Sequence, residues 1–230
     1  MSETVILSGL SAIIFDLDGT LVDSLDDITY ALNGALESIG RPPAQRDQVR
    51  GWVGDGLPQL CRRACPDVDE DEIQQVIANA AQWYREACTA ATRPYGNILK
   101  MLDLLKAQGA PMAVLSNKPD DLTKRVIHEL KLASYFVDAR GMISESDRKP
   151  SPDAALAQAR SMGIRPEKVL LVGDSVVDIQ TARNAGMVAA SVLWGFQEKK
   201  LLESARPDHF VSDPMEIFFL WDEKKKWVKG

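Results

Sequence analysis

Short apolar runs that alternate with helical stretches constrain the fold of this chain more than any other feature of its sequence. Four runs rich in Val, Ile or Leu are predicted to be buried strands, and a shorter run is a candidate fifth: residues 12–15, 112–115, 168–172, 188–193 and 209–211. Strand and helix patterns alternate from residue 94 to 195. This alternation predicts an α/β fold in which helices cover both faces of a parallel sheet.

Residues 24–92 interrupt the alternation, because they contain helical patterns and no strand candidate. The first of these helices has an apolar stripe that stops before Gly40: Leu25, Ile28, Leu32, Ala35, Leu36 and Ile39. We therefore expect a helical module formed by residues 24–92. It is inserted into a sheet domain formed by residues 1–23 and 93–230, with linkers near residues 23–24 and 92–94.

The composition is that of a globular chain, with 45% hydrophobic residues, 26% charged residues and a net charge of −6. This negative charge argues against nucleic acid or an anionic membrane as a partner. Residues 1–16 lack a basic segment, and their apolar runs are too short for a signal peptide or a membrane span, so a cytoplasmic protein is expected. Cys61, Cys65 and Cys88 are interpreted as small apolar helix residues that form no disulfide.

The C-terminal segment, residues 213–230, is predicted to start a helix, because Asp213 can cap it and Pro214 suits its first turn. Its Phe218 and Phe219 are expected to pack against the sheet or a second subunit, and its lysines are interpreted as a solvated terminus. The choice between a monomer and a homodimer stays open.

Polar residues follow several of the predicted strands, at the edge where a parallel sheet binds its ligands. Asp16 and Asp18 follow the first strand, Ser116 and Asn117 the second, and Asp174 and Asp178 the third, while Lys149 lies in a loop that can reach the same edge. We therefore expect these side chains to meet.

Four carboxylates that converge need a compensating cation, because their repulsion would otherwise raise their pKa values. Oxygen ligands suit Mg²⁺, which an incoming phosphate can also bind. Asp16 is then placed to attack phosphorus, and Asp18 to protonate the leaving oxygen and later deprotonate a water molecule. Lys149 and Ser116 would neutralise and orient the phosphoryl oxygens.

Each of these signals, taken alone, has a more ordinary explanation. A calcium loop starting at Asp16 is excluded, because Leu21 and Asp27 occupy the positions that need Gly and Glu. Ser116 alone could simply end a strand, Lys149 alone could face solvent, and "GDSVVD" alone could cap a helix. The order and spacing of all four segments together favour a phosphoryl-transfer site.

These segments together resemble the haloacid dehalogenase-like hydrolase superfamily. The matching segments, from motif one to motif four, are "FDLDGTLVDS", "VLSNKP", "RKPSPD" and "VGDSVVDIQTARNAG", and the resemblance spans residues 12–195. It implies a Rossmann-like core with a helical cap inserted after motif one. It also implies that Asp16 is the nucleophile, that Asp18 is the acid and base, and that Mg²⁺ is held by Asp16, the Asp18 backbone carbonyl and Asp174. Asp178 would act near the metal, directly or through water.

Within this superfamily the chain is most similar to phosphoglycolate phosphatases, on "DLDGTLVDSLDDITYALNGAL", "VGDG" and "SNKP". The similarity implies Mg²⁺-dependent hydrolysis of a small phosphorylated metabolite, with Thr20 supporting the catalytic loop and Thr20 and Asn117 near the substrate. A sugar-phosphate or nucleotide phosphatase, a β-phosphoglucomutase-like phosphotransferase and a non-catalytic binding protein stay open as alternatives. Asp18 argues against a dehalogenase, and the lack of histidine in residues 24–92 argues against a mutase.

Substrate selection is expected to depend on the inserted module, because the core residues serve phosphoryl transfer in general. The loop of residues 50–60 is the candidate, since Gly54 and Gly56 allow close backbone approach to a small substrate. Arg50, Arg62 or Arg63 are candidate partners for a substrate carboxylate.

Overall fold

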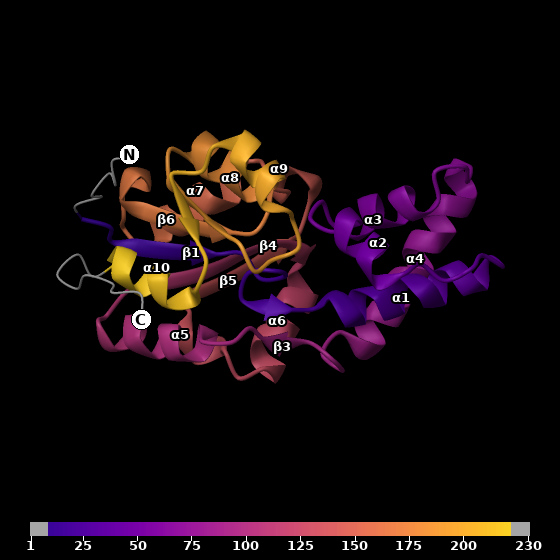
Figure 1. The fold of residues 1–230 in the computed structure, drawn as a ribbon, viewed down its shortest axis with the longest axis horizontal. Helices are drawn as coiled ribbons and strands as arrows, with labels where there is room; N and C mark the ends of the chain where they lie inside the picture. Colours follow the sequence, from indigo (N-terminus) through magenta and orange to yellow (C-terminus); the bar gives the residue numbers. More distant parts are fainter. Residues whose placement is uncertain (1–8, 222–230) are drawn as a thin grey trace.

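The computed structural model describes residues 9–221 and contains a six-stranded, fully parallel sheet (Figure 1). The strand order is β5-β4-β1-β6-β7-β8. The strands are β1 (Ala12–Phe15), β4 (Met112–Pro119), β5 (Asp138–Met142), β6 (Val169–Gly173), β7 (Val188–Val192) and β8 (His209–Val211). The predicted α/β class is confirmed.

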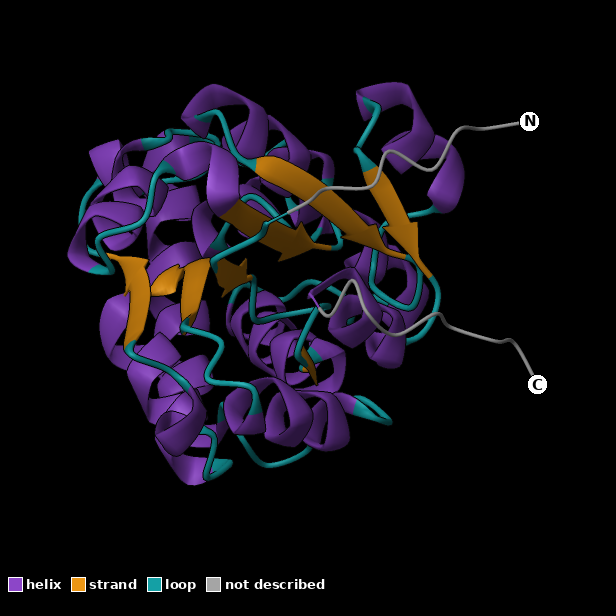
Figure 2. Ribbon diagram, turned by 90° about the vertical axis from the view of Figure 1, so that its left-hand side faces the viewer, coloured by secondary structure: helices purple, strands orange, loops and turns teal. Residues whose placement is uncertain are grey.

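Helices cover both faces of the sheet, as Figure 2 shows, because neighbouring side chains on a strand point to opposite sides. Ile13 and Phe15 of β1 pack with one helical layer, whereas Ala12 and Ile14 pack with the other. The first layer contains α5 (Ile98–Ala107), α6 (Asp120–Glu129) and α10 (Pro214–Trp221), and the second contains α7 (Asp153–Ser161), α8 (Val176–Ala185) and α9 (Lys199–Ala205).

The five predicted strands are present, but the sequence pattern missed β5. This edge strand has the sequence DARGM, and only Gly141 in it is buried, so it contains no apolar run. β4 also extends four residues beyond the prediction, to Pro119, with a shift in its pairing with β5 after Leu115. Ser116 and Asn117 therefore lie within β4 rather than after it.

The inserted segment forms four helices: α1 (Leu25–Ser38), α2 (Arg46–Trp52), α3 (Leu57–Ala64) and α4 (Glu70–Ala87). These helices, called the helical cap below, lie beside the core in Figure 1. Apolar residues of α1 and α4, among them Leu32 and Val76, are fully buried in one cluster. An antiparallel pair of short strands, β2 (Val22–Asp23) and β3 (Arg93–Pro94), lies where the chain passes between cap and core.

A buried carboxylate fixes the point where the helical cap returns to the core. Asp27, in the first turn of α1, accepts hydrogen bonds from the backbone N–H groups of Ala91 and Thr92 and from the Thr92 hydroxyl, at 2.6–3.1 Å. Asp27 is 4% exposed, so these bonds are shielded from water. The start of α1 and the end of the inserted segment are therefore tied together.

The remaining expectations concern the cysteines and the C-terminal segment. All three cysteines are buried free thiols, as interpreted. α10 packs against the core of the same chain, where Phe218 is buried, and the Met215 N–H donates to Asp213 at 2.8 Å. The lysines of residues 222–230 lie outside the described residues. Within residues 9–221, every helix is too short or too polar to cross a membrane.

We predict that Asp27→Ala lowers the free energy of unfolding by about 3 kcal/mol, because buried donors lose a charged acceptor. Urea denaturation followed by circular dichroism measures this change. Asp26→Ala is the matched control, since Asp26 is exposed and pairs with Arg46 at the surface; its loss is expected to be under about 1 kcal/mol. Equal losses in the two variants would contradict the assigned role of Asp27.

Candidate active site

Three carboxylates meet at the carboxyl end of the sheet. Asp16 directly follows β1 and Asp174 directly follows β6, and these neighbouring strands are in register, with Phe15 beside Val172. Asp178 comes from the first turn of α8. One oxygen from each of the three carboxylates lies within 4.8 Å of the others, and all three residues are buried. The predicted convergence is present for these residues.

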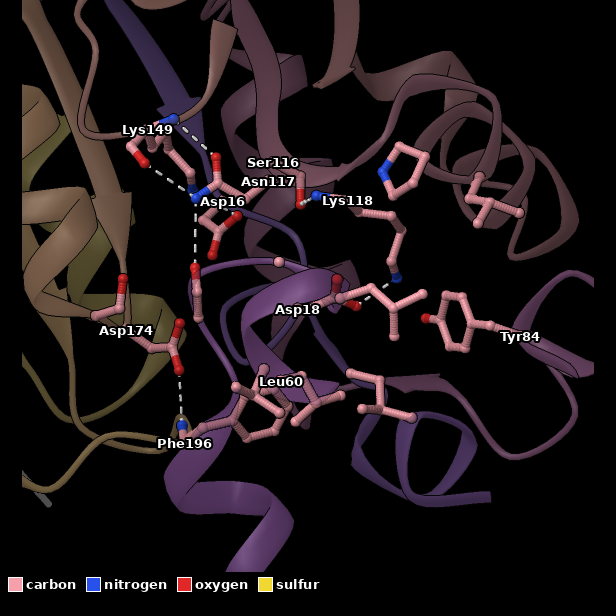
Figure 3. A pocket seen from close by; sticks show the side chains of 18 of the residues that line it. Asp16, Asp18, Leu60, Tyr84, Ser116, Asn117, Lys118, Lys149, Asp174 and Phe196 are labelled. Carbon is pink, nitrogen blue, oxygen red and sulfur yellow. Dashed lines mark hydrogen bonds and ion pairs between the residues drawn. The ribbon is translucent and has the colours of Figure 1, made fainter. Parts of the chain in front are cut away.

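Lys149 is the positive charge in direct contact with this carboxylate cluster. Its ammonium lies 2.9 Å from Asp16 Oδ1 and 2.6 Å from Asp178 Oδ1, and it donates to the Leu115 carbonyl at 3.2 Å. The Lys149 side chain is only 3% exposed. Lys149 therefore binds two of the three carboxylates from the core side of the site (Figure 3).

Asn117 holds the Lys149 loop in place. The Lys149 N–H donates to Asn117 Oδ1 at 2.8 Å, and Asn117 Nδ2 donates back to the Lys149 carbonyl at 3.2 Å. Asn117 Nδ2 also reaches the Gly54 carbonyl of the helical cap, at 3.4 Å. Asn117 also lines the pocket, where it was predicted to lie near the substrate. Its contacts with Lys149 give it a second role, which is to position the Lys149 loop.

The cluster has more negative charge than Lys149 neutralises. Burial raises the pKa of Asp16 to about 7. Repulsion from Asp178 also raises this pKa, whereas the positive charge of Lys149 lowers it. Burial and the nearby Asp16 and Asp178 hold the pKa of Asp174 well above its ordinary value. Burial alone would lower the pKa of Lys149, but the charges of Asp16 and Asp178 raise it above its ordinary value.

This donor set fits a hard divalent cation. Asp16, Asp174 and Asp178 offer only oxygen ligands, which Mg²⁺ prefers, and a cation among them would offset the burial and the mutual repulsion that raise the pKa values of Asp16 and Asp174. The group of Asp18 predicted to bind the metal is its backbone carbonyl; the Asp18 carboxylate lies outside this cluster and binds Ser24 and Lys118.

The loops around Asp174 approach it closely. Gly19 has φ +83°, and a Cβ built there would lie 2.2 Å from Asp174 Oδ2; a Cβ at Gly195 would lie 2.1 Å from the Asp174 Cβ. The Phe196 N–H donates to Asp174 Oδ2 at 2.7 Å. Thr20, predicted near the substrate, is 1% exposed and does not line the pocket. Its hydroxyl donates to Asp174 Oδ1 at 3.4 Å, so Thr20 contacts this carboxylate from outside the pocket.

Asp18 is held by two donors that both contact its Oδ1. The Ser24 hydroxyl donates at 2.5 Å, and the Lys118 ammonium at 2.6 Å. Lys118 is a buried pocket residue that the sequence pattern did not single out, because a lone lysine after a strand is usually exposed. Its spacing from Ser116 carried the signal, since residues two apart in a strand share a face. Lys118 is instead 7% exposed and lines the pocket.

A pocket lies between the core and the helical cap. Its core side contains Asp16, Asp18, Ser116 and Lys149, and its cap side includes Gly54 and Gly56. The remaining cap side is mostly apolar: Ile28, Val53, Leu57, Leu60, Ala81 and Tyr84. Its volume is about 90 Å³. One water molecule needs about 10–15 Å³, so the pocket suits a molecule with few non-hydrogen atoms.

The cap loop at residues 53–56 touches the core directly. Arg148 donates a hydrogen bond to the Asp55 carbonyl, next to the Asn117 contact with Gly54. Gly56 has φ +83°, and a Cβ there would lie 3.3 Å from Arg148 and 3.4 Å from the Asn117 carbonyl. The two glycines therefore let the cap backbone approach the core, as well as line the pocket.

The three arginines proposed for a substrate carboxylate do not line the pocket. Arg62 forms a surface ion pair with Glu70, and Arg63 pairs with Asp55. Arg50 is exposed. The arginine that lines the pocket is Arg85 of α4, which the sequence argument did not select because it considered only the loop of residues 50–60.

Comparison with known proteins gives consistent results. The family model described as "Haloacid dehalogenase-like hydrolase" matches residues 13–192. The chain is 35% identical over 213 residues to "Phosphoglycolate phosphatase" of Aquifex aeolicus, covering 93% of this chain and 97% of that protein. It is 36% identical over 222 residues to "Phosphoglycolate phosphatase 1" of Pseudomonas aeruginosa, covering 94% and 81%. A crystal structure of a predicted phosphoglycolate phosphatase from Haemophilus somnus aligns with a TM-score of 0.86 at 30% identity, covering 92% and 98%.

We predict that Mg²⁺ stabilises the protein and that Asp174→Asn removes most of this effect. At a concentration about 100 times the dissociation constant, the ion is expected to stabilise the fold by about 2.7 kcal/mol, or roughly 5–10 °C in Tm. Thermal denaturation with Mg²⁺ and with a chelator measures the shift. Asp18→Asn is the control and should keep the shift, because the Asp18 side chain lies outside the cluster. An undiminished shift in Asp174→Asn would rule out this cation site.

Proposed function

Because this chain belongs to the haloacid dehalogenase-like hydrolase family, we propose that it hydrolyses a small phosphate monoester through a phosphoryl group carried on Asp16. The observation that carries this proposal is the placement of Asp16. Its carboxylate lines a small pocket, is held through Oδ1 by Lys149, and lies in a cluster suited to a divalent cation.

The first step transfers the phosphoryl group to the protein. The second carboxylate oxygen of Asp16, which Lys149 does not hold, forms a bond to phosphorus while the bond from phosphorus to the ester oxygen breaks. Asp18, in its protonated form, gives its proton to that leaving oxygen, and the alcohol departs. Asp18 lines the same pocket two residues further along the loop, as this role requires.

The second step releases phosphate. The Asp18 carboxylate takes a proton from a water molecule, whose oxygen attacks phosphorus as the bond to Asp16 breaks. Inorganic phosphate leaves, and the Asp16 carboxylate and protonated Asp18 are restored. Ser24 and Lys118 both hold Asp18 Oδ1, which fixes the carboxyl group for both proton transfers.

Positive charge and hydrogen-bond donors stabilise the phosphoryl oxygens in both steps. Lys149 is already placed against Asp16, and the Ser116 hydroxyl lines the same side of the pocket. Mg²⁺ held by Asp16, Asp174 and Asp178 would supply further neutralisation of the phosphoryl charge. The residues needed for phosphoryl transfer thus all belong to the core.

The proposed substrate is 2-phosphoglycolate. The support comes from the names of the relatives, whose similarity extends over more than nine-tenths of this chain. The pocket volume of about 90 Å³ agrees with a substrate this small. A mutase-like phosphotransferase stays disfavoured, since the two histidines of the chain, His128 and His209, lie outside the helical cap.

We predict that Asp16→Asn lowers kcat for 2-phosphoglycolate by at least about 10³-fold, because an amide cannot act as the nucleophile. Release of inorganic phosphate in the presence of Mg²⁺ measures the loss, and circular dichroism checks that the fold is intact. Substantial residual turnover by the folded variant would refute the covalent mechanism.

We predict that Asp18→Asn slows hydrolysis of alkyl phosphates more than hydrolysis of p-nitrophenyl phosphate. The alkoxide leaving group needs a proton, whereas nitrophenolate leaves readily without one. The ratio of the two kcat/KM values, compared between wild type and variant, tests the role. Equal losses on both esters would show that Asp18 is not the general acid.

A further inference from the structure

Lys118 of the core and Tyr84 of the helical cap meet on the cap side of the pocket. Lys118 lies near the end of β4, Tyr84 lies in the last turns of α4, and the ammonium is 5.0 Å from the centre of the Tyr84 ring. Both residues are buried and both line the pocket. Figure 3 shows the Tyr84 hydroxyl pointing into the pocket, toward Lys118 and Asp18.

These two groups have hydrogen-bonding capacity that the protein does not use. The Tyr84 hydroxyl is buried and makes no hydrogen bond of good geometry within residues 9–221. The Lys118 ammonium has three donors; it donates to Asp18 Oδ1 and lies beside the Tyr84 hydroxyl oxygen, which leaves the proton of that hydroxyl without an acceptor of good geometry in residues 9–221. Buried polar groups are normally hydrogen-bonded, so an orphaned hydroxyl at a pocket wall indicates a missing ligand.

The pocket wall around Lys118 and Tyr84 is mostly apolar on the cap side. Apart from Arg85, the other cap residues that line the pocket are apolar, as is Leu122 of the core, and Asp18 Oδ1 is already bound by Ser24 and Lys118. The phosphoryl-binding groups Asp16, Ser116 and Lys149 lie on the core side, which leaves Lys118 and Tyr84 for another part of a bound molecule. Two donors, one of them cationic, select an anionic acceptor over a neutral one.

We propose that Lys118 and Tyr84 form the binding site for a second anionic group of the substrate, a carboxylate close to the phosphate ester. This inference rests on the proposed phosphatase function and specifies its substrate class. The carboxylate accepts one hydrogen bond from the Lys118 ammonium and one from the Tyr84 hydroxyl. Since one donor belongs to the core and the other to the cap, such a substrate also holds the two parts together.

Arg85 is the other candidate for binding the substrate carboxylate, because it is a cation that also lines the pocket. Its side chain is 58% exposed, and its closest acidic partner, Asp121, is 3.9 Å away. An exposed guanidinium is already satisfied by water and gains less from a carboxylate than a buried, partly unpaired donor does. Arg85 is therefore assigned to the pocket rim, and the experiment includes it.

The experiment compares two esters, 2-phosphoglycolate and 2-hydroxyethyl phosphate, which has a hydroxymethyl group in place of the carboxylate. The ratio of their kcat/KM values measures selection for the carboxylate and cancels effects on the phosphoryl-transfer steps. The ratio is measured for wild type, Tyr84→Phe, Lys118→Met and Arg85→Met. Tyr95→Phe is the matched control, because the Tyr95 hydroxyl is also buried and unpartnered within the described residues but lies outside the pocket.

We expect Tyr84→Phe to lower the preference for 2-phosphoglycolate about 10-fold, as for one lost hydrogen bond to a charged group. Lys118→Met should lower it further, while Arg85→Met and Tyr95→Phe leave it within about 2-fold of wild type. An unchanged ratio in Tyr84→Phe and Lys118→Met overturns the inference, and a fall in Arg85→Met alone assigns the carboxylate to the rim.

The same measurements separate this inference from the proposed function. If wild type hydrolyses both esters equally well, the carboxylate site is refuted while the phosphatase proposal stands. If wild type hydrolyses neither these esters nor p-nitrophenyl phosphate, the proposed function fails and the inference fails with it. If Tyr84→Phe slows both esters equally, Tyr84 acts on Asp18 through Lys118 and not on the substrate.

Discussion

The buried contact between Lys149 and the carboxylates of Asp16 and Asp178 is the interaction on which the rest of the site depends. Buried charges are costly to desolvate, and replacing such pairs with apolar residues often leaves a protein as stable or more so. The stability of the fold therefore comes from elsewhere, from the two apolar layers that pack on the sheet. Those layers hold Asp16, Asp174 and Asp178 close together although their charges repel one another. The proposed phosphoryl transfer accounts for the presence of these charges in a buried site.

The core and the helical cap contribute different groups to the pocket. The core supplies every charged group around Asp16, and its loops approach Asp174 so closely that glycine is needed at positions 19 and 195. The helical cap supplies an apolar wall, the Gly54 and Gly56 loop, and the Tyr84 hydroxyl. A general phosphoryl-transfer centre thus faces a wall that can be varied without changing the chemistry.

Asn117 and Lys118 connect these two parts from adjacent positions on β4. Asn117 bonds both to the Lys149 loop and to the Gly54 carbonyl of the cap, while Lys118 bonds to Asp18 and lies against Tyr84 of the cap. The position of the cap is therefore coupled to the groups that hold the proposed nucleophile and the proposed acid. A substrate that binds Tyr84 and Lys118 would favour this position of the cap and the catalytic geometry together.

The sequence by itself determined the fold class, the inserted helices and the residues that meet around Asp16, because apolar periodicity and the edge rule for parallel sheets are local or general properties. It missed β5, which lacks an apolar run and is recognised as a strand only by its pairing with β4. Only the tertiary structure decided that Lys118, rather than Arg50, Arg62 or Arg63, is a buried cation in the pocket, and that Thr20 lies beneath Asp174. Burial and partner choice depend on which distant segments pack together, and no local pattern encodes that.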